Sequence, residues 1–237
     1  MTEKPFRLLY SDKELAVVVK SVGILSQREY GSEDDMVSLL SKHFRALGGP
    51  CEIYPVHRLD RGVGGVMVYA RTRRSAASLS ASLSDHEATE KEYLAVIRGS
   101  LPAESGIMED YLFHDERRRR TFVVDAGHTL AKPARLSYRV LASASACDGK
   151  HYSLLAIRLY TGRTHQIRVQ LSSRGYPLAG DGRYGAHDRF PGIALFSHRL
   201  SFSHPQTSER MTFEAEPFSV LPFTLFHSLP LKGVSLE

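Results

Sequence analysis

The amino-acid sequence predicts an α+β fold with a mixed, mainly antiparallel β-sheet and peripheral helices. The expected strands outnumber the expected helices, and several of them are joined by short turns, which favours antiparallel pairing. The chain has 237 residues, of which 42% are hydrophobic, enough to bury a core of ordinary size. We therefore expect one domain over residues 1–237.

Runs of β-branched or alternating apolar residues predict the strands. The expected strands cover residues 7–10, 15–20, 66–71, 92–98, 136–140, 155–159 and 194–203. A loop at Cys147-Asp148-Gly149 separates the two strands of the 136–159 region.

Three helices are expected between these strands. Apolar residues recur at helical spacing from Val37 to Leu47, and Gly48-Gly49 closes that helix. A second helix is predicted over residues 75–86. The third is expected to be capped by Thr164 and to run to Arg174.

Composition excludes several classes of protein. No apolar run approaches the length that spans a membrane, and residues 1–6 lack the apolar segment of a secretory signal. Cys51 and Cys147 are too few and too far apart for a disulfide framework or a metal knuckle. These features predict a cytoplasmic protein with reduced thiols and no bound metal.

The positive charge is clustered rather than spread along the chain. The formal net charge is +5 and the sequence pI is about 9.2. The arginines gather in three groups: Arg58, Arg61, Arg71, Arg73 and Arg74; Arg117 to Arg120; and Arg163, Arg168 and Arg174. Because guanidinium groups suit phosphate oxygens, separate clusters indicate a polyanionic partner. A solvated face is an equally good interpretation of the run from Arg117 to Arg120.

Four motifs carry the chemistry. The first, residues 55–70, sets Asp60 between Arg58 and Arg61 and ahead of a glycine-rich stretch, so that basic neighbours favour its ionised form. The other three are Lys91-Glu92-Tyr93-Leu94-Ala95-Val96-Ile97-Arg98-Gly99, Gly162-Arg163-Thr164-His165-Gln166-Ile167-Arg168-Val169-Gln170-Leu171 and Gly180-Asp181-Gly182-Arg183-Tyr184-Gly185.

With these four motifs in this order, the chain resembles an RNA pseudouridine synthase of the RluA type, from Leu8 to about Pro205. The resemblance implies the pseudouridine synthase fold, with a central cleft. It also implies an isomerase that detaches a uridine base from its ribose, turns it and rejoins it through carbon 5. That reaction needs no cofactor and no metal ion.

The resemblance also implies the site. Asp60 matches the catalytic aspartate, which can act as a nucleophile or abstract a ribose proton; the sequence leaves both routes open. Arg168 matches the basic partner of that aspartate, with Arg163 as the competing candidate. Tyr93 matches the tyrosine that stacks on the target base. Leu195 matches an apolar residue on the other side of the base, although core packing explains it almost as well.

Other residues are expected to contact RNA. The stretch with His57, Arg58 and Arg61 lies beside the extruded nucleotide in the family, and Arg163 is expected among the RNA contacts. The expected partner is structured ribosomal or transfer RNA, with the target in a stem-loop. We expect a monomer.

The chain departs from the family pattern in two ways. Val63-Gly64-Gly65 stands where Thr-Ser-Gly is usual, so two hydroxyls that could brace the aspartate loop are missing. The catalytic pattern also begins close to residue 1, which predicts a stand-alone catalytic domain without an N-terminal RNA-binding domain.

Two other functions are weighed against this one. An RNA-binding or folding-helper protein on the same scaffold is the main alternative, and retention of Asp60, Tyr93 and Arg168 argues against it. A glycosidase with an aspartate nucleophile ranks far behind, because no second carboxylate stands out near the motifs.

Overall fold

The computed structural model describes residues 4–28, 35–85, 88–146, 149–188, 190, 192–217, 219 and 221–226. The chain divides into two compact units, Met1–Lys91 with Ser197–Glu216 and Glu92–Phe196 with Pro217–Glu237. One catalytic domain with a central cleft therefore stays a prediction. No helix in the described part of the chain is long and apolar enough to cross a membrane.

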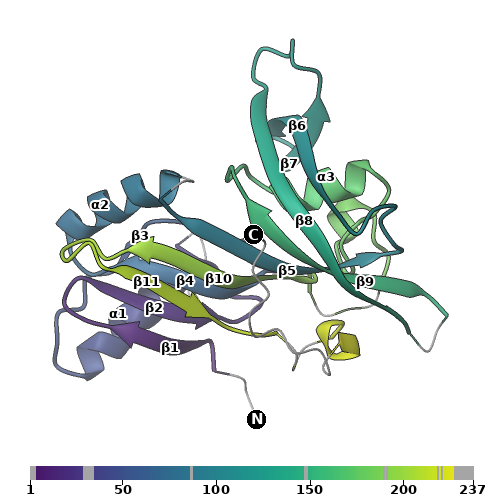
Figure 1. Ribbon diagram of the computed structural model, residues 1–237. Helices are drawn as coiled ribbons and strands as arrows, with labels where there is room; N and C mark the ends of the chain where they lie inside the picture. The colour runs from purple at the N-terminus through teal and green to yellow at the C-terminus, as the bar shows by residue number, and fades with distance from the viewer. Residues whose placement is uncertain are drawn as a thin grey trace. The chain divides into compact units, whose positions relative to one another are not determined.

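The first unit is built on a sheet in which every strand pair with a defined register is antiparallel (Figure 1). Its strands are β1 (Phe6–Ser11), β2 (Leu15–Lys20), β3 (Tyr54–Pro55), β4 (Gly64–Ala70), β10 (Leu195–Ser203, from Ser197 on) and β11 (Arg210–Glu214). The order is β1-β2-β4-β10, with β11 paired to β10 and β3 paired to β4. Every residue of β4 is buried, so this strand forms the centre of the unit.

Two helices flank this sheet, α1 (Met36–Ala46) and α2 (Arg73–Ser84) (Figure 1). Both begin at side-chain caps, which satisfy main-chain donors of the first turn. Asp35 Oδ1 accepts from the Val37 and Ser38 nitrogens at 2.9 and 3.1 Å. Their buried apolar residues are Met36, Leu40, Phe44, Leu79 and Leu83.

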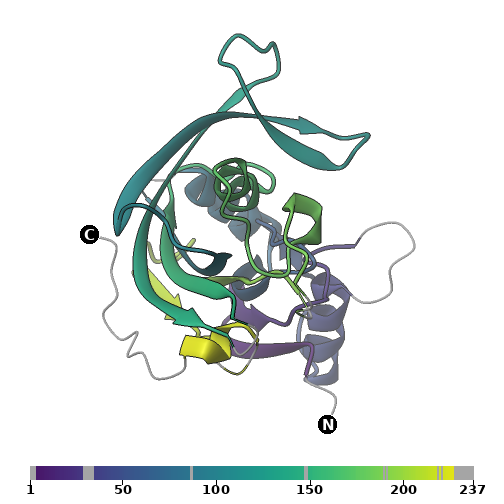
Figure 2. The same cartoon turned by 90° about the vertical axis from the view of Figure 1, so that its right-hand side faces the viewer.

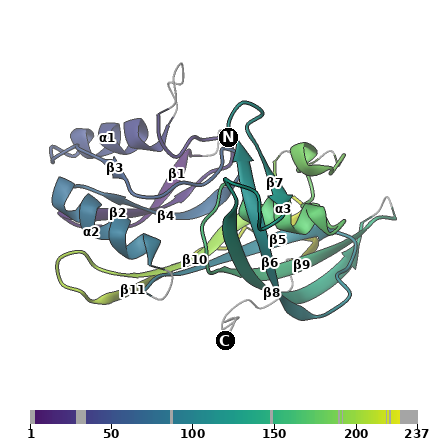
Figure 3. The ribbon, with the colours of Figure 1, turned by 90° about the horizontal axis from the view of Figure 1, so that it is seen from above.

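The second unit contains the other sheet, in the order β5-β9-β8-β6-β7. Its strands are β5 (Glu90–Arg98, from Glu92 on), β6 (Ser105–Asp115), β7 (Arg120–Val124), β8 (Lys132–Ser145) and β9 (His151–Leu159). All of these strand pairs for which a register is defined are antiparallel. The outer strands β6, β7 and β8 arch over the helix α3 (Gln166–Ser173) (Figures 2 and 3). Leu112, Ala134, Val169 and Tyr184 form a buried cluster that packs α3 beneath the arch.

These elements confirm the predicted α+β fold and all of the expected strands and helices, within a few residues at their ends. The strands β3, β6, β7 and β11 were not predicted, because their short or irregular alternation gives little periodic signal. Arg117, Arg118 and Arg119 lie in the turn of the β6–β7 hairpin, and Arg120 is the first residue of β7. His86, where the second predicted helix ended, and Cys147 and Asp148 of the predicted loop lie outside the described residues.

The prediction that Thr164 caps the third helix is wrong. The N-cap residue is His165, in a left-handed conformation with φ 55° and no side-chain capping bond. The Thr164 carbonyl oxygen instead accepts the Thr121 hydroxyl at 2.8 Å. Contact with β7 therefore decides where α3 begins, and the local capping preference does not.

Gly65 stands where the usual Thr-Ser-Gly sequence also has glycine, and the structure shows why a glycine is needed there. Its φ is +124°, and a Cβ placed there would lie 2.3 Å from the Ser197 carbonyl oxygen on β10. Only glycine allows the two main chains to approach so closely.

We predict that Gly65→Ala lowers the free energy of unfolding by about 3 kcal/mol or prevents folding, since it adds a main-chain clash to a disfavoured φ. Urea unfolding followed by circular dichroism measures the change. Gly127→Ala is the control, because a Cβ at Gly127 meets nothing within 4 Å and its φ is not in the left-handed range. Equal stability of the two variants would contradict the prediction.

Candidate active site

The first unit holds Asp60 in a loop whose two neighbouring residues are both fixed. The Ser26 hydroxyl donates to the Leu59 carbonyl oxygen at 2.7 Å and accepts from the Leu59 nitrogen at 2.9 Å. On the other side, the Gly23 nitrogen donates to the Arg61 carbonyl oxygen at 2.8 Å, and Arg61 Nε donates to the Gly23 carbonyl oxygen at 2.9 Å. The segment 23–26 therefore clamps the main chain on each side of Asp60.

A buried lysine supports that segment. Lys20, at the end of β2, has no exposed surface, and its Nζ donates to the carbonyl oxygens of Ser21 and Ile24 at 3.1 and 2.8 Å. Burial lowers the pKa of Lys20 to about 8, and the nearby Asp60 carboxylate opposes this shift. The Tyr69 hydroxyl of β4 adds a bond to the Ser26 carbonyl oxygen at 2.9 Å.

His57 joins the start of the Asp60 loop to β4. Its Nε2 accepts the Val68 main-chain N–H at 3.0 Å, which requires the unprotonated form of that nitrogen. Burial, with a smaller effect of the Lys91 ammonium, lowers the pKa of His57 to about 3. His57 is therefore neutral at physiological pH and orients the loop; contact of its ring with RNA stays a prediction.

The second unit holds Arg168 in a buried ion pair. Arg168 Nε and Nη2 donate to the two carboxylate oxygens of Asp181 at 2.7 and 2.9 Å, and both side chains are buried. This two-bond arrangement fixes the plane of the guanidinium group as well as its position. Arg163 differs in being exposed, with its Nε bound to the Pro133 carbonyl oxygen.

Tyr184 connects this ion pair to its surroundings. The Arg168 guanidinium carbon lies 5.0 Å from the centre of the Tyr184 ring. The Tyr184 hydroxyl accepts from the Thr121 nitrogen at 2.9 Å and lies 2.9 Å from His165 Nδ1. Burial raises the pKa of the Tyr184 phenol, so the hydroxyl keeps its proton and can donate to His165.

Main-chain bonds link the remaining predicted residues of the second unit. Tyr93 is half-buried on β5, and Leu195 is buried at the start of β10. Val96 of β5 donates to the Ala194 carbonyl oxygen and accepts from the Ala179 nitrogen, both at 2.9 Å. The strand of Tyr93, the residue before Leu195 and the segment leading to Asp181 therefore belong to one hydrogen-bonded frame.

The predicted site residues thus fall into two groups, one in each unit. The first unit carries His57, Arg58, Asp60 and Arg61, and the second carries Tyr93, Arg163, Arg168 and Leu195. The expected pairing of Arg168 with Asp60 would join the two groups and stays a prediction.

Comparison with known proteins identifies the family. The model of the RNA pseudouridylate synthase family matches residues 14–173, which include Asp60, Tyr93 and Arg168. The chain belongs to the RNA pseudouridine synthase family. Members of this family are isomerases that convert uridine in RNA to pseudouridine, so the expected family and class of enzyme are confirmed.

Individual pseudouridine synthases agree with this assignment. A Bacillus subtilis protein named an uncharacterized RNA pseudouridine synthase is 32% identical over 216 residues, which cover 89% of this chain and 68% of that protein. The ribosomal large subunit pseudouridine synthase D of Nitrosomonas europaea is 32% identical over 222 residues, covering 89% of this chain and 62% of the relative. The solved structure of human "RNA Pseudouridylate Synthase Domain Containing 1" has the same fold, with a TM-score of 0.76 and 21% sequence identity. The match covers 92% of this chain and 86% of the human chain.

The structure adds residues to the site of this pseudouridine synthase that the sequence analysis did not single out. Lys20 and Ser26 support the Asp60 loop, and Asp181 and Tyr184 support Arg168. Asp181 and Tyr184 stand in a motif that was recognised, but without a role. Lys20 is a charged residue at the end of an otherwise apolar strand, and this anomaly is the sequence signal that could have pointed to it.

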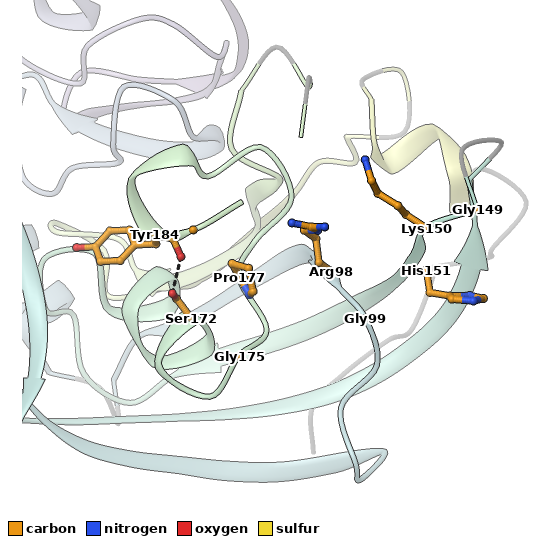
Figure 4. A pocket seen from close by; sticks show the side chains of 10 residues that line it. Arg98, Gly99, Gly149, Lys150, His151, Ser172, Gly175, Pro177 and Tyr184 are labelled. Atoms are coloured by element: carbon orange, nitrogen blue, oxygen red, sulfur yellow. Dashed lines mark hydrogen bonds between the residues drawn. The ribbon is translucent and has the colours of Figure 1, made fainter. Parts of the chain in front are cut away.

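A pocket of about 680 Å³ in the second unit is lined in part by Tyr184. Figure 4 shows the Arg98 and Lys150 side chains at this pocket, whereas the Tyr184 ring points away from it. The two cations share one carboxylate, since Asp188 Oδ1 lies 3.5 Å from Arg98 Nε and 3.9 Å from Lys150 Nζ. The Ser172 hydroxyl, which lines the pocket, is bound to the Tyr184 carbonyl oxygen (Figure 4).

We predict that Asp181→Asn lowers the free energy of unfolding by about 3 kcal/mol, because it removes the carboxylate charge that makes two hydrogen bonds to the buried Arg168 guanidinium. Thermal unfolding measures the effect. Arg118→Gln breaks the exposed pair with Asp115 and should cost less than about 1 kcal/mol. A loss for Asp181→Asn no larger than for Arg118→Gln would show that the buried pair does not stabilise the fold.

We also predict that His57 makes the protein less stable in acid. The folded-state pKa of about 3 lies below the unfolded value of 6.5, so the unfolded chain binds more protons between these pH values. Stability should therefore fall as the pH drops from about 6.5 toward 3, and His57→Gln should flatten that dependence. Denaturant unfolding at several pH values tests this, with the exposed His151→Gln as the control; identical slopes in wild type and His57→Gln would refute it.

Proposed function

We propose that this chain isomerises one or a few specific uridines in structured ribosomal or transfer RNA, with Asp60, Tyr93 and Arg168 as catalytic residues. The match of the family model across all three residues carries the proposal. The fixed Asp60 loop and the buried, oriented Arg168 support it, since catalytic groups act best when their positions are already set.

In the proposed reaction the bond between N1 of uracil and C1′ of ribose breaks, and a bond between C5 and C1′ forms. The proton lost from C5 is balanced by a proton gained at N1, so substrate and product are isomers. No oxidant, reductant or added group is required, which supports a reaction without a cofactor. The Asp60 carboxylate begins the reaction, as a nucleophile or as a base toward a ribose proton.

Other residues are proposed to hold the RNA. Tyr93 stacks on the extruded base, and Leu195 contacts the opposite face of the base. Arg58, Arg61 and Arg163 are exposed, as contacts to a phosphate backbone require. The exposed arginines of the β6–β7 turn add positive charge to the second unit. His57 is proposed to lie beside the substrate.

The identity of the RNA is the finer part of the proposal. Several curated relatives are named ribosomal large subunit pseudouridine synthase D, which favours ribosomal RNA for this chain. A target in a stem-loop costs less energy to extrude than one in a duplex. A cytoplasmic location and a monomeric state stay predictions.

We predict that Asp60→Asn keeps the fold and the affinity for RNA but lowers turnover at least about 1,000-fold, because the amide lacks the carboxylate's nucleophilicity and basicity. Pseudouridine mapping of total RNA by chemical adduct-stop sequencing, with and without the gene, identifies the target. The missing site should return with wild type and with Glu52→Gln, an exposed acidic control in the same unit, but not with Asp60→Asn.

If no site is missing from the cells, purified protein and unmodified RNA decide between a redundant enzyme and an RNA-binding protein. Formation of pseudouridine by the purified wild type would support the proposed function. Tight RNA binding with no turnover would favour the binding or folding-helper alternative. Turnover by Asp60→Asn would overturn the assignment of Asp60.

A further inference from the structure

We propose that Lys20 is a positioning residue for Asp60: its buried ammonium group fixes the segment that clamps the Asp60 loop and sets a positive charge near the carboxylate. This inference rests on the proposed catalytic role of Asp60. It adds a cation from the first unit itself to the arginine expected from the family.

The first support is the chain of contacts from Lys20 to Asp60. Lys20 Nζ binds the carbonyl oxygens of Ser21 and Ile24, at the two ends of a short turn. That turn contains Gly23, which makes two bonds to Arg61, and it leads to Ser26, which makes two bonds to Leu59. Loss of the ammonium group would therefore loosen both clamps at once.

The second support is the cost of placing a lysine here. Lys20 is completely buried, and a buried ammonium group is expensive unless its charge has a use or a partner. The carbonyl oxygens supply hydrogen bonds but no negative charge. The negative charge that acts on Lys20 is the Asp60 carboxylate, which favours the charged ammonium form of the lysine.

Three other charged groups near the loop, Asp35, Arg61 and Lys91, have partners of their own. Asp35 accepts the first main-chain N–H groups of α1, and its charge acts on Tyr69. Arg61 is bound through Nε to the Gly23 carbonyl oxygen. Lys91, whose pKa burial also lowers to about 8, donates to the Leu83 carbonyl oxygen and acts on His57.

Titration of the lysine side chains by NMR tests the electrostatic part of the proposal. In Asp60→Asn the pKa of Lys20 should fall by at least about 0.5 unit, because removal of a nearby negative charge disfavours the ammonium form. Lys91 serves as an internal control in the same spectra and should not move. Glu52→Gln, which removes a negative charge from the exposed surface of the same unit, should leave both lysines unchanged.

Kinetics test the positioning part. Lys20→Met should lower kcat about 10- to 100-fold, with the Kd for RNA within about twofold of wild type, because the clamp acts on Asp60 and not on the RNA. The wild-type rate should also decline above about pH 8, where Lys20 loses its proton, and Lys20→Met should lack that decline. The exposed Lys42→Met is the matched control and should behave as wild type.

The outcomes separate this inference from the proposed function. An unchanged Lys20 pKa in Asp60→Asn, or wild-type kcat and pH profile in Lys20→Met, would overturn the role of Lys20 even if Asp60→Asn is inactive. Turnover by Asp60→Asn would instead overturn the proposed function, whatever the titration gives. If Lys20→Met does not fold, the titration of folded Asp60→Asn still decides the inference.

Discussion

The ion pair between Arg168 and Asp181 is the interaction on which the organisation of the second unit depends. A guanidinium group can be buried only if acceptors inside the same unit replace its lost hydration. Asp181 meets this need because main-chain bonds to β5 hold the segment that precedes it. The Tyr184 ring then covers the guanidinium group and ties α3 to β7. One buried charge thus constrains a helix, two strands and a loop.

The first unit meets the same constraint with different chemistry. Lys20 is compensated by main-chain carbonyl oxygens and by the field of Asp60, not by a direct two-bond partner. An ammonium group suits this arrangement, because it is compact and can donate in three directions. An arginine suits the second unit, where its planar fork matches a carboxylate. The choice of cation in each unit follows from the acceptors available there.

Contacts with β4 and with the segment 23–26 brace the loop of Asp60 without the hydroxyls of the usual Thr-Ser-Gly sequence. Gly65 lets β10 approach β4 so closely that no side chain fits between them, and the Ser197 hydroxyl binds the Val66 carbonyl oxygen. His57 adds a bond to β4 from the other end of the loop. Bracing that Thr and Ser hydroxyls could provide in the family pattern is thus provided here by the main chain of β4 and by the segment 23–26.

The sequence by itself determined the fold class, the family and the approximate bounds of the regular elements with strong signals, such as β2 and the helix α1. Those features depend on local periodicity, on capping or on motif order, all of which can be read directly from the order of the residues. Only the tertiary structure decided that α3 is capped by His165 and not by Thr164. It also decided that Asp181 compensates the buried charge of Arg168 and that Lys20 itself carries a buried charge. These roles depend on contacts between residues far apart in sequence, where burial changes the energy of a charge, and no local pattern encodes that environment.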